Sequence, residues 1–422
     1  MGNKPRIRFK GFTEDWEQRK LGDTNSFFTD GNYGNDYPTA NEMSDSVNGV
    51  PFLRGSNLNN GAINLVDVNY ITKQKHNLLT SGHTKFDDII IAVRGSLGNC
   101  GYVAKQFIDI NINSQLAIIR TDKNELSGLF LIEYLLSSLG KKEINRNITG
   151  TALKQLPINS LKMINIKYPS INEQEKISIL LSKLNASITL HQCKLEKLKL
   201  TKKALLQKLF PKNGKHIPEI RFKGFTDTWE QRKLSKLATM NARIGWQNLR
   251  TSEFLDSGDY LLITGTDFDN GRVKYSTCHY VEKKRFDQDT KIQISTGSIL
   301  ITKDGTLGKV ALVEELPKPA TLNAGVFNVR VKDDAVLSYK YLYHYLKAPF
   351  LMKYVTANAT GGTIKHLNQS ILVDFPIPIT EKPEQDRIAK LLDSLESSIT
   401  LHQRKLERLQ EVKKGLLQKM FV

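Results

Sequence analysis

A chain of 422 residues is too long for one ordinary hydrophobic core and long enough for two domains with connecting elements. Apolar residues make up 40% of it, which excludes wholesale disorder, and 61 Lys and Arg residues against 43 Asp and Glu residues leave a formal charge of +18. This excess favours an anionic partner, nucleic acid first, over a basic surface that is merely solvated.

The same sequence favours a cytoplasmic location. No apolar run approaches the roughly 20 residues that a membrane-spanning helix needs. The start, MGNKPRIRFKGF, lacks the apolar segment of a secretory signal, and Arg6 stands where a myristoylation site has Ser or Thr. Cys100, Cys193 and Cys278 are scattered and odd in number, so we expect a reducing compartment and no disulfide framework.

Two segments occur twice in the chain, about 211 residues apart, a period far longer than any solenoid repeat. Residues 7–21 read IRFKGFTEDWEQRKL, and residues 220–234 read IRFKGFTDTWEQRKL. Residues 187–208 read SITLHQCKLEKLKLTKKALLQK, and residues 398–419 read SITLHQRKLERLQEVKKGLLQK. The stretches between them hardly match. A duplicated frame around two divergent inserts indicates one architecture that carries two different readers.

Each insert alternates strand-like and helix-like patterns. Residues 87–95 (DDIIIAVRG) and 298–305 (SILITKDG) are short Ile-rich runs that end in Gly, which is typical of buried strands. Residues 129–139 (LFLIEYLLSSL) and 339–349 (YKYLYHYLKAP) each predict a single helix. We therefore expect a mixed α/β fold with two similar globular domains.

A heptad pattern follows each insert, with seam positions spaced alternately by 4 and 3 residues, as in a left-handed coiled coil. Pro211 ends the first helix, and Pro383 stands at the start of the second, where its missing N–H costs little. The first seam comprises Ile177, Leu181, Leu184, Ile188, His191, Leu195, Leu198, Lys202, Leu205 and Leu209. The second comprises Ile388, Leu392, Leu395, Ile399, His402, Leu406, Leu409, Lys413, Leu416 and Met420.

The two helices should pair antiparallel. The first ends near Phe210, just before the second opening motif, so the second helix has to run back along the first. Some 38 residues would make a rod of about 57 Å with an approximate two-fold axis near His191 and His402, which we expect to fix register. The expected boundaries are 1–169 and 212–379 for the domains, and 170–211 and 380–422 for the helices.

A chain with a pseudo-dyad and two unlike readers suits duplex DNA, in which two half-sites lie a fixed distance apart. Bases are read by fixed donor and acceptor groups, and phosphates are bound by basic and hydroxyl side chains and by backbone N–H groups of Gly-rich turns. Gly-bounded segments supply these groups, although each one alone is more often an ordinary turn. Three such segments correspond between the inserts: 53–57 with 263–267, 94–98 with 304–308, and 149–156 with 360–367.

From these segments, and from RIGWQNLR (243–250), come the candidate DNA-binding residues. In the first domain they are Arg54, Asn57, Arg94, Ser96, Thr151 and Lys154. In the second domain they are Arg243, Trp246, Gln247, Arg250, Thr266, Lys303, Thr306, Lys309, Thr363 and Lys365.

Signals of catalysis are scarce. The chain has no G-x-G-x-x-G after a strand and no phosphate-binding G-x-x-x-x-G-K-[ST]. Without a Pro-Pro dipeptide it also lacks the Asn/Asp-Pro-Pro-aromatic loop of amino-methyltransferases. His and Cys residues show no metal spacing, and the acid pairs at 87–88 and 333–334 are more typical of turns. We expect a non-catalytic chain without a metal or cofactor of its own.

Three duplicated motifs together resemble the specificity subunit of Type I restriction–modification systems, and the resemblance covers essentially the whole chain. They are Trp-Glu-Gln-Arg-Lys-Leu (16–21, 229–234), Thr-Gly-x-x-[Leu/Ile]-Lys-x-Leu (149–156, 360–367) and Lys-Lys-x-Leu-Leu-Gln-Lys-[Leu/Met]-Phe (202–210, 413–421).

The resemblance implies two target recognition domains, each reading one half of a bipartite asymmetric DNA target, with the helices setting the gap. It implies a non-catalytic subunit that binds two methyltransferase subunits, which use S-adenosylmethionine to methylate adenine at N6. Two motor–nuclease restriction subunits, with ATP and Mg²⁺, would complete the enzyme. These cofactors would all belong to the partners.

Two identical partners need two equivalent docking sites, which the duplicated frame would supply. Its aromatic residues either help to form those sites or anchor the opening segments to a core. They are Trp16, Trp229, Phe9, Phe12, Phe222 and Phe225.

Two other functions stay open on the sequence. One is a coiled-coil scaffold that recruits proteins without reading DNA. The other is a stand-alone nuclease or methyltransferase.

Overall fold

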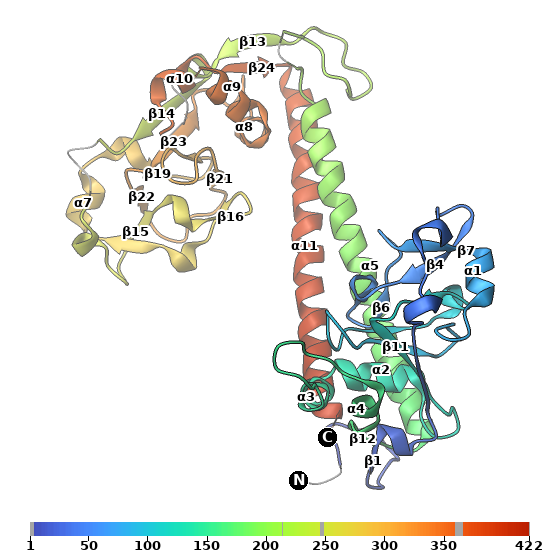
Figure 1. Cartoon of the computed structure of the whole chain (residues 1–422). Helices are drawn as coiled ribbons and strands as arrows, with labels where there is room; N and C mark the ends of the chain where they lie inside the picture. Colours follow the sequence, from blue (N-terminus) through green and yellow to red (C-terminus); the bar gives the residue numbers. More distant parts are fainter. Residues whose placement is uncertain (1–3, 213, 245–248, 359–365, 422) are drawn as a thin grey trace. The chain divides into compact units, whose positions relative to one another are not determined.

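The computed structural model describes residues 4–212, 214–244, 249–358 and 366–421 (Figure 1). It divides into two compact units. The first unit holds Met1–Gln192 and Arg404–Val422, and the second holds Cys193–Gln403. Each unit therefore combines one α/β domain with part of both long helices, α5 (Ile171–Lys208) and α11 (Lys382–Met420). Among the described residues, no helix has the length and apolar composition that crossing a membrane requires.

The first unit is built on two four-stranded sheets, β10-β4-β7-β3 and β2-β11-β8-β9, and two small pairs, β1-β12 and β5-β6. Its strands are β1 (Glu17–Lys20), β2 (Phe27–Asp30), β3 (Met43–Ser44), β4 (Gly49–Leu53), β5 (Leu58–Asn59), β6 (Ala62–Ile63), β7 (Asn69–Thr72), β8 (Ile89–Ala92), β9 (Cys100–Tyr102), β10 (Asn111–Ile112), β11 (Leu116–Arg120) and β12 (Asn165–Tyr168). Its shorter helices are α1 (Lys73–Leu78), α2 (Gly128–Leu136), α3 (Ser138–Arg146) and α4 (Ile158–Lys162).

Strand β8 explains why its sequence is a continuous apolar run. Ile89 and Ile91 face the core shared with α2, whereas Ile90 faces a second core that contains Leu53 and Ile112. A strand buried on both faces needs apolar residues at every position rather than at alternate ones.

The second unit repeats this plan with a six-stranded sheet, β14-β23-β20-β21-β17-β16, a four-stranded sheet, β18-β15-β22-β19, and the pair β13-β24. Its strands are β13 (Glu230–Lys233), β14 (Ala238–Ala242), β15 (Tyr260–Ile263), β16 (Phe268–Asp269), β17 (Arg272–Val273), β18 (His279–Val281), β19 (Gln293–Ile294), β20 (Ile299–Thr302), β21 (Val310–Leu312), β22 (Ala320–Leu322), β23 (Val326–Val331) and β24 (Pro376–Ile379). Its shorter helices are α6 (Leu234–Leu237), α7 (Lys283–Asp287), α8 (Tyr339–Lys347), α9 (Phe350–Asn358) and α10 (Gln369–Val373).

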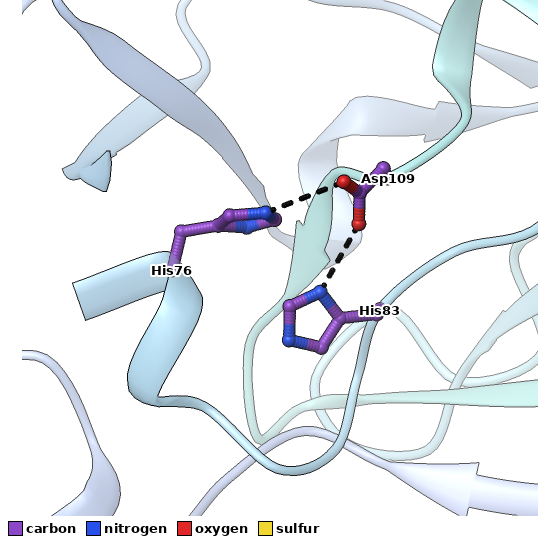
Figure 2. Close-up of side chains that lie close together, drawn as sticks. All are labelled: His76, His83 and Asp109. Atoms are coloured by element: carbon purple, nitrogen blue, oxygen red, sulfur yellow. Dashed lines mark hydrogen bonds and ion pairs between the residues drawn. The ribbon is translucent and has the colours of Figure 1, made fainter. Parts of the chain in front are cut away.

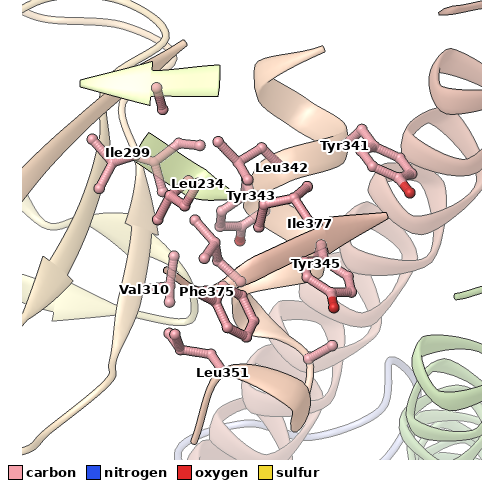
Figure 3. Close-up of a cluster of buried hydrophobic side chains, with 14 of the residues drawn as sticks. Leu234, Ile299, Val310, Tyr341, Leu342, Tyr343, Tyr345, Leu351, Phe375 and Ile377 are labelled. Carbon is pink, nitrogen blue, oxygen red and sulfur yellow. The ribbon is translucent and has the colours of Figure 1, made fainter. Parts of the chain in front are cut away.

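The core of the second unit lies between its large sheet and the helices α8 and α9. Ile299 of β20 packs there with Leu342 and Leu351 (Figure 3). Leu300 faces the other core, between the two sheets. Strand β20 thus plays the part that β8 plays in the first unit.

Both helices expected at 129–139 and 339–349 are present but end earlier. Helix α2 stops at Leu136 because Ser137 is extended and its hydroxyl caps α3 by accepting a hydrogen bond from the Gly140 N–H (3.1 Å). Helix α8 stops at Lys347 because Ala348 precedes Pro349, and a residue before proline is driven out of the helical region.

The opening motifs are core anchors. Trp16 and Trp229 are each only 1% exposed. The Trp16 ring lies 5.8 Å from that of Phe130 and 6.2 Å from that of Phe421, which follows the end of α11. These burials decide between the two alternatives for the tryptophans, since a residue in the core is not a docking surface. Phe9 and Phe222 pack against the cores, and Phe12 and Phe225 lie under Lys176 and Arg387.

The long helices pair antiparallel within each unit. In the first unit, Ile177 and Leu181 at the start of α5 share a core with Met420 at the end of α11. In the second unit, Leu209, just beyond the end of α5, shares a core with Leu392 near the start of α11. Every residue of the two expected seams is buried or half-buried. The heptad pattern therefore describes the contact face of the helices.

The lysines that interrupt the two seams are paired. Lys202 Nζ lies 2.5 Å from Glu396 Oε1, and Lys347 of α8 lies 2.8 Å from the same oxygen. At the equivalent place in the first unit, Lys413 Nζ lies 3.7 Å from the Glu133 carboxylate of α2. In both units an ion pair thus joins a long helix to the α/β domain beside it.

Candidate nucleic-acid interface

Three loops that contain the candidate residues come together in the first unit. They follow β4 and β8 and form the turn at 149–155. A side-chain carbon at Gly55 would lie 3.7 Å from Cβ of Ser96, so the first two loops are in contact. The Leu156 N–H donates to the Val93 carbonyl (3.0 Å), which ties the third loop to the second. Three separate sequence signals therefore form one surface.

The second unit builds the same arrangement with equivalent hydrogen bonds. The Leu367 N–H donates to the Lys303 carbonyl (2.8 Å), as Leu156 does to Val93. The Asn323 N–H donates to the Ile263 carbonyl (2.9 Å). The equivalent hydrogen bond in the first unit runs from the Asn113 N–H to the Leu53 carbonyl. Residues 360–365 of the third loop, with the candidates Thr363 and Lys365, lie outside the described residues.

Four candidates in the first unit are exposed: Arg94, Ser96, Thr151 and Lys154. The Arg94 guanidinium lies 5.2 Å from the centre of the Tyr33 ring, a cation–π contact, and Tyr33 is itself 41% exposed. A cation beside an exposed aromatic face suits both a phosphate and a base.

Asn57 has an internal role instead. It is 2% exposed, its Oδ1 accepts from the Arg54 backbone N–H (2.9 Å), and its Nδ2 donates to the Asn64 carbonyl (3.1 Å). This amide holds the loop together, so the expectation that it contacts DNA is wrong. Arg54 is half-buried and donates through Nη2 to the Asp67 carbonyl (2.8 Å).

In the second unit Thr266, Thr306 and Lys309 are exposed. Lys303 is half-buried, with its ammonium 5.7 Å from the centre of the Phe327 ring. Buried Thr302 shapes this loop, since its hydroxyl accepts from the Lys309 N–H (2.9 Å). The backbone is thus fixed from inside while the side chains of the loop point outward.

The segment RIGWQNLR gives a mixed result. Arg243 is 2% exposed, and its guanidinium donates to the Leu322 carbonyl (2.9 Å) and to the Thr321 hydroxyl (3.2 Å). Burial lowers the pKa of Arg243. This residue braces the β22 end of the sheet, so the expected DNA contact is wrong here as well. Arg250 is exposed, and Trp246 and Gln247 lie outside the described residues.

Sequence reasoning missed two features. Tyr33 lies in GNYGND, where an aromatic residue among Gly and Asn indicates a loop position, but only the structure shows its contact with Arg94. His76, His83 and Asp109 lie together in the first unit (Figure 2), and their donor atoms are all within 4.8 Å of one another. Asp109 follows His83 by 26 positions, a separation that no metal-binding sequence pattern captures.

The chain is similar in sequence to proteins of one known family. The family model described as the Type I restriction modification DNA specificity domain matches residues 13–200 and 226–411. The putative type I restriction enzyme MjaX specificity subunit of Methanocaldococcus jannaschii is 23% identical over 414 residues, covering 96% of this chain and 92% of that protein. The EcoR124I/EcoR124II specificity subunit of Escherichia coli is 27% identical over 151 residues, 35% of this chain and 37% of that one.

Solved structures agree on the fold. The crystal structure of the Type I restriction–modification S subunit from M. genitalium superposes with a TM-score of 0.65 at 16% identity, covering 99% of both chains. A chain from a study of complex assembly in the type I R-M system gives 0.51 at 18% identity, covering 96% and 97%. The two segments matched by the family model, 13–200 and 226–411, make up most of the sequence and correspond to its two internal repeats. The chain belongs to the DNA specificity subunits of Type I restriction–modification systems, which are non-catalytic and carry two target recognition domains.

Proposed function

We propose that the two target recognition domains, residues 1–169 and 212–379, read the two unlike halves of a bipartite DNA target, while the helices at 170–211 and 380–422 set the gap. The observation that carries this proposal is the convergence of three loops in the first unit, together with the equivalent backbone hydrogen bonds among the described residues of the second. Their backbones are held by equivalent hydrogen bonds, but Arg94-Gly95-Ser96 in one corresponds to Asp304-Gly305-Thr306 in the other. The same scaffold with different side chains suits two different half-sites.

The exposed and half-exposed loop residues make up the proposed contact set. In the first unit they are Arg54, Arg94, Ser96, Thr151 and Lys154, with Tyr33 added. In the second they are Arg250, Thr266, Lys303, Thr306 and Lys309. Trp246, Gln247, Thr363 and Lys365 stay as predictions from sequence.

A binding selection on random duplexes tests this function, with the chain bound to its methyltransferase partner. We expect two enriched motifs separated by a constant gap. Arg94→Ala should relax the first motif and leave the second unchanged, because Arg94 belongs to the first unit and the second unit has Asp304 at the equivalent position. A selection that enriches no split motif would favour the scaffold alternative.

We further propose that two methyltransferase subunits bind the duplicated helix surface. Leu190 of α5 and Leu401 of α11 occupy equivalent places in the two SITLHQ segments, and each is 65% exposed. Large exposed apolar residues repeated at equivalent sites suit two copies of one partner, since each copy would bury one leucine. S-adenosylmethionine would then belong to these partners, and ATP and Mg²⁺ to two motor–nuclease subunits that complete the enzyme.

Charge substitution tests the docking surface. Leu190→Asp or Leu401→Asp should each remove one methyltransferase subunit, and the double variant both, when the mass of the complex is measured in solution. Leu200→Asp is the matched control, because Leu200 is 66% exposed on α5 but corresponds to Glu411 in the other repeat. A double variant that still binds two partners would place the docking site elsewhere.

A further inference from the structure

The cluster of His76, His83 and Asp109 joins three parts of the first unit. His76 lies on α1, His83 follows that helix, and Asp109 precedes β10 (Figure 2). His76 Nε2 lies 3.5 Å from Asp109 Oδ2, and His83 Nδ1 lies 3.3 Å from Asp109 Oδ1. The two rings are 4.7 Å apart between centroids. One nitrogen of each imidazole is therefore directed at the same carboxylate.

The opposite nitrogen of each ring is already committed as a donor. His83 Nε2 lies 2.9 Å from the Leu79 carbonyl, which can only accept, so Nε2 carries the hydrogen. His76 Nδ1 lies 2.5 Å from Asn111 Oδ1, which accepts in this orientation of the amide, an orientation that leaves the buried Asn111 Nδ2 without a hydrogen-bond partner among the described residues. In the neutral rings, the nitrogens directed at Asp109 then hold lone pairs. Three electron-pair donors converge with no hydrogen between them.

Such a convergence needs a positive charge at its centre. A proton on one facing nitrogen would leave the lone pair of the other imidazole directed at the carboxylate, and protons on both would make both rings imidazolium, two like charges in contact against one carboxylate. A single divalent cation satisfies all three donors instead. In a tetrahedral zinc site with bonds of about 2.0–2.1 Å, neighbouring donors are about 3.3 Å apart. The two nitrogen–oxygen separations of 3.5 Å and 3.3 Å are of this size but end on different oxygens of Asp109, and the three ligand atoms lie within 4.8 Å of one another, so the side chains would close in around a bound ion.

The surroundings match those of a metal site. Metal-bound histidines commonly donate their second N–H to a backbone carbonyl or another oxygen, which fixes the ring, and here Leu79 and Asn111 accept these bonds. The side chain of His76 is 10% exposed and that of Asp109 is 68% exposed. One side of the cluster is thus embedded in protein while the carboxylate side opens to water, as an entry path and a solvent ligand require.

The second unit gives an internal comparison. His83 bridges Asn111 in the position where Gln293 pairs with Thr321. Asp109 lies two residues before Asn111, and Pro319 lies two residues before Thr321. His76 and Phe286 are both the fourth residue of the equivalent helices α1 and α7. The second unit therefore has no histidine or carboxylate at any of the three positions, and among the described residues this cluster occurs in the first unit alone.

We propose that His76, His83 and Asp109 bind one zinc(II) ion, with water as the fourth ligand. Two imidazoles and a carboxylate are a donor set that suits this metal. The ion clips α1 and the segment after it to the strand β10, and its effect is on the stability of the first target recognition domain. No chemical step is assigned to it.

Metal content tests the proposal directly. The full chain without a histidine tag, carrying Cys193→Ser to remove an exposed thiol, is stripped with chelator, equilibrated with zinc(II), desalted and assayed. We expect one zinc per chain. Cobalt(II) should occupy the same site and give visible d–d absorption that zinc(II) displaces.

Two ligand variants and one control make the test specific. Asp109→Asn and His83→Gln should each weaken binding by at least about 10–100-fold, and zinc(II) should raise the melting temperature of the parent but not of these variants. Asp109 is exposed, so its substitution should leave the metal-free fold intact, as circular dichroism would verify. His366→Gln, which removes an exposed histidine paired with Asp304, should bind like the parent.

Two results would overturn the site. One is no stoichiometric uptake, which would leave a hydrogen-bond cluster in which the Asn111 amide is turned and His76 donates to Asp109. The other is uptake that Asp109→Asn and His83→Gln do not reduce.

Discussion

Arg221 and Glu384 are joined by two parallel hydrogen bonds, from Nε at 2.8 Å and from Nη2 at 2.9 Å, which tie the second opening motif to the start of α11. In the first unit Arg8 and Glu173 make the same pair at 2.7 Å and 2.7 Å. Both glutamates are fully buried. The duplicated arginine and glutamate thus have a structural explanation: each pair fastens a chain segment to a helix that begins more than 160 positions later.

Arg221→Ala should destabilise the second unit by about 3 kcal/mol, because it leaves a buried carboxylate without its cation. This value is at the lower end of the range of about 3–5 kcal/mol for removing one partner of a buried ion pair. The reason is that Glu384 still accepts hydrogen bonds from Trp229 Nε1 (3.1 Å) and from the Thr380 hydroxyl. Urea denaturation would measure it. Arg232→Ala, which removes an exposed pair with Glu230, should change little, and equal effects of the two would contradict the role of burial.

Acid should weaken the second unit through Glu396. Burial alone would raise its pKa, but the ammonium groups of Lys347 and Lys202 outweigh burial and lower the pKa to about 2. A carboxylate with a folded pKa below its unfolded value of roughly 4.3 adds stability above that pH and loses it as the pH falls toward 2.

The free energy of unfolding should therefore drop between about pH 4.3 and pH 2, by at most about 3 kcal/mol from this group. Glu396→Gln should flatten that part of the stability profile, as denaturation at a series of pH values would show. A variant with the parent's slope would mean that other carboxylates govern the acid limb.

Lys154→Ala should weaken DNA binding about equally on all sequences, because an exposed lysine at a loop tip is suited to a phosphate. The log–log dependence of binding on salt should fall by about 0.9 for one lost phosphate contact. Lys73→Ala is the control, because Lys73 is also exposed but lies away from the loops. It follows Thr72, which pairs with Gly49 at the start of β4, whereas the candidate loop follows the other end of that strand. Unchanged affinity in Lys154→Ala would remove it from the interface.

Inserting four residues into α5 after Gln192, where the chain passes from one unit to the other, should alter the preferred gap between half-sites. Four helical residues add about 6 Å, and they shift the seam out of phase with its heptads. The selection on random duplexes would report the gap. The same insertion beside Val47, which is 85% exposed in a turn, should leave it unchanged. A constant gap in both proteins would dismiss the spacer role.

The sequence predicted the helices and the repeat well because these depend on local periodicity. Leu181 and Leu392 follow from spacing, and their burial confirms the pattern. The ends of α2 and α8 were predicted less accurately, because each is set by a single residue: Ser137, whose hydroxyl caps α3, and Pro349, which drives Ala348 out of the helix.

The candidate interface was predicted in outline only. The Gly-bounded segments of the first unit do converge, but Asn57 and Arg243 have the residue types of DNA readers and turn inward. A side chain's type does not show which way it points, because that depends on which carbonyl groups the fold leaves for it to satisfy.

By itself the sequence determined the duplicated frame, the heptad seams and the family, because these are properties of residues close together along the chain or of one copy against another. Only the tertiary structure decided that His76, His83 and Asp109 meet, since this depends on β10 pairing in parallel with β4, from Asn111 to Phe52. Contacts of that range are made by strand pairing and core packing, and no local pattern records them.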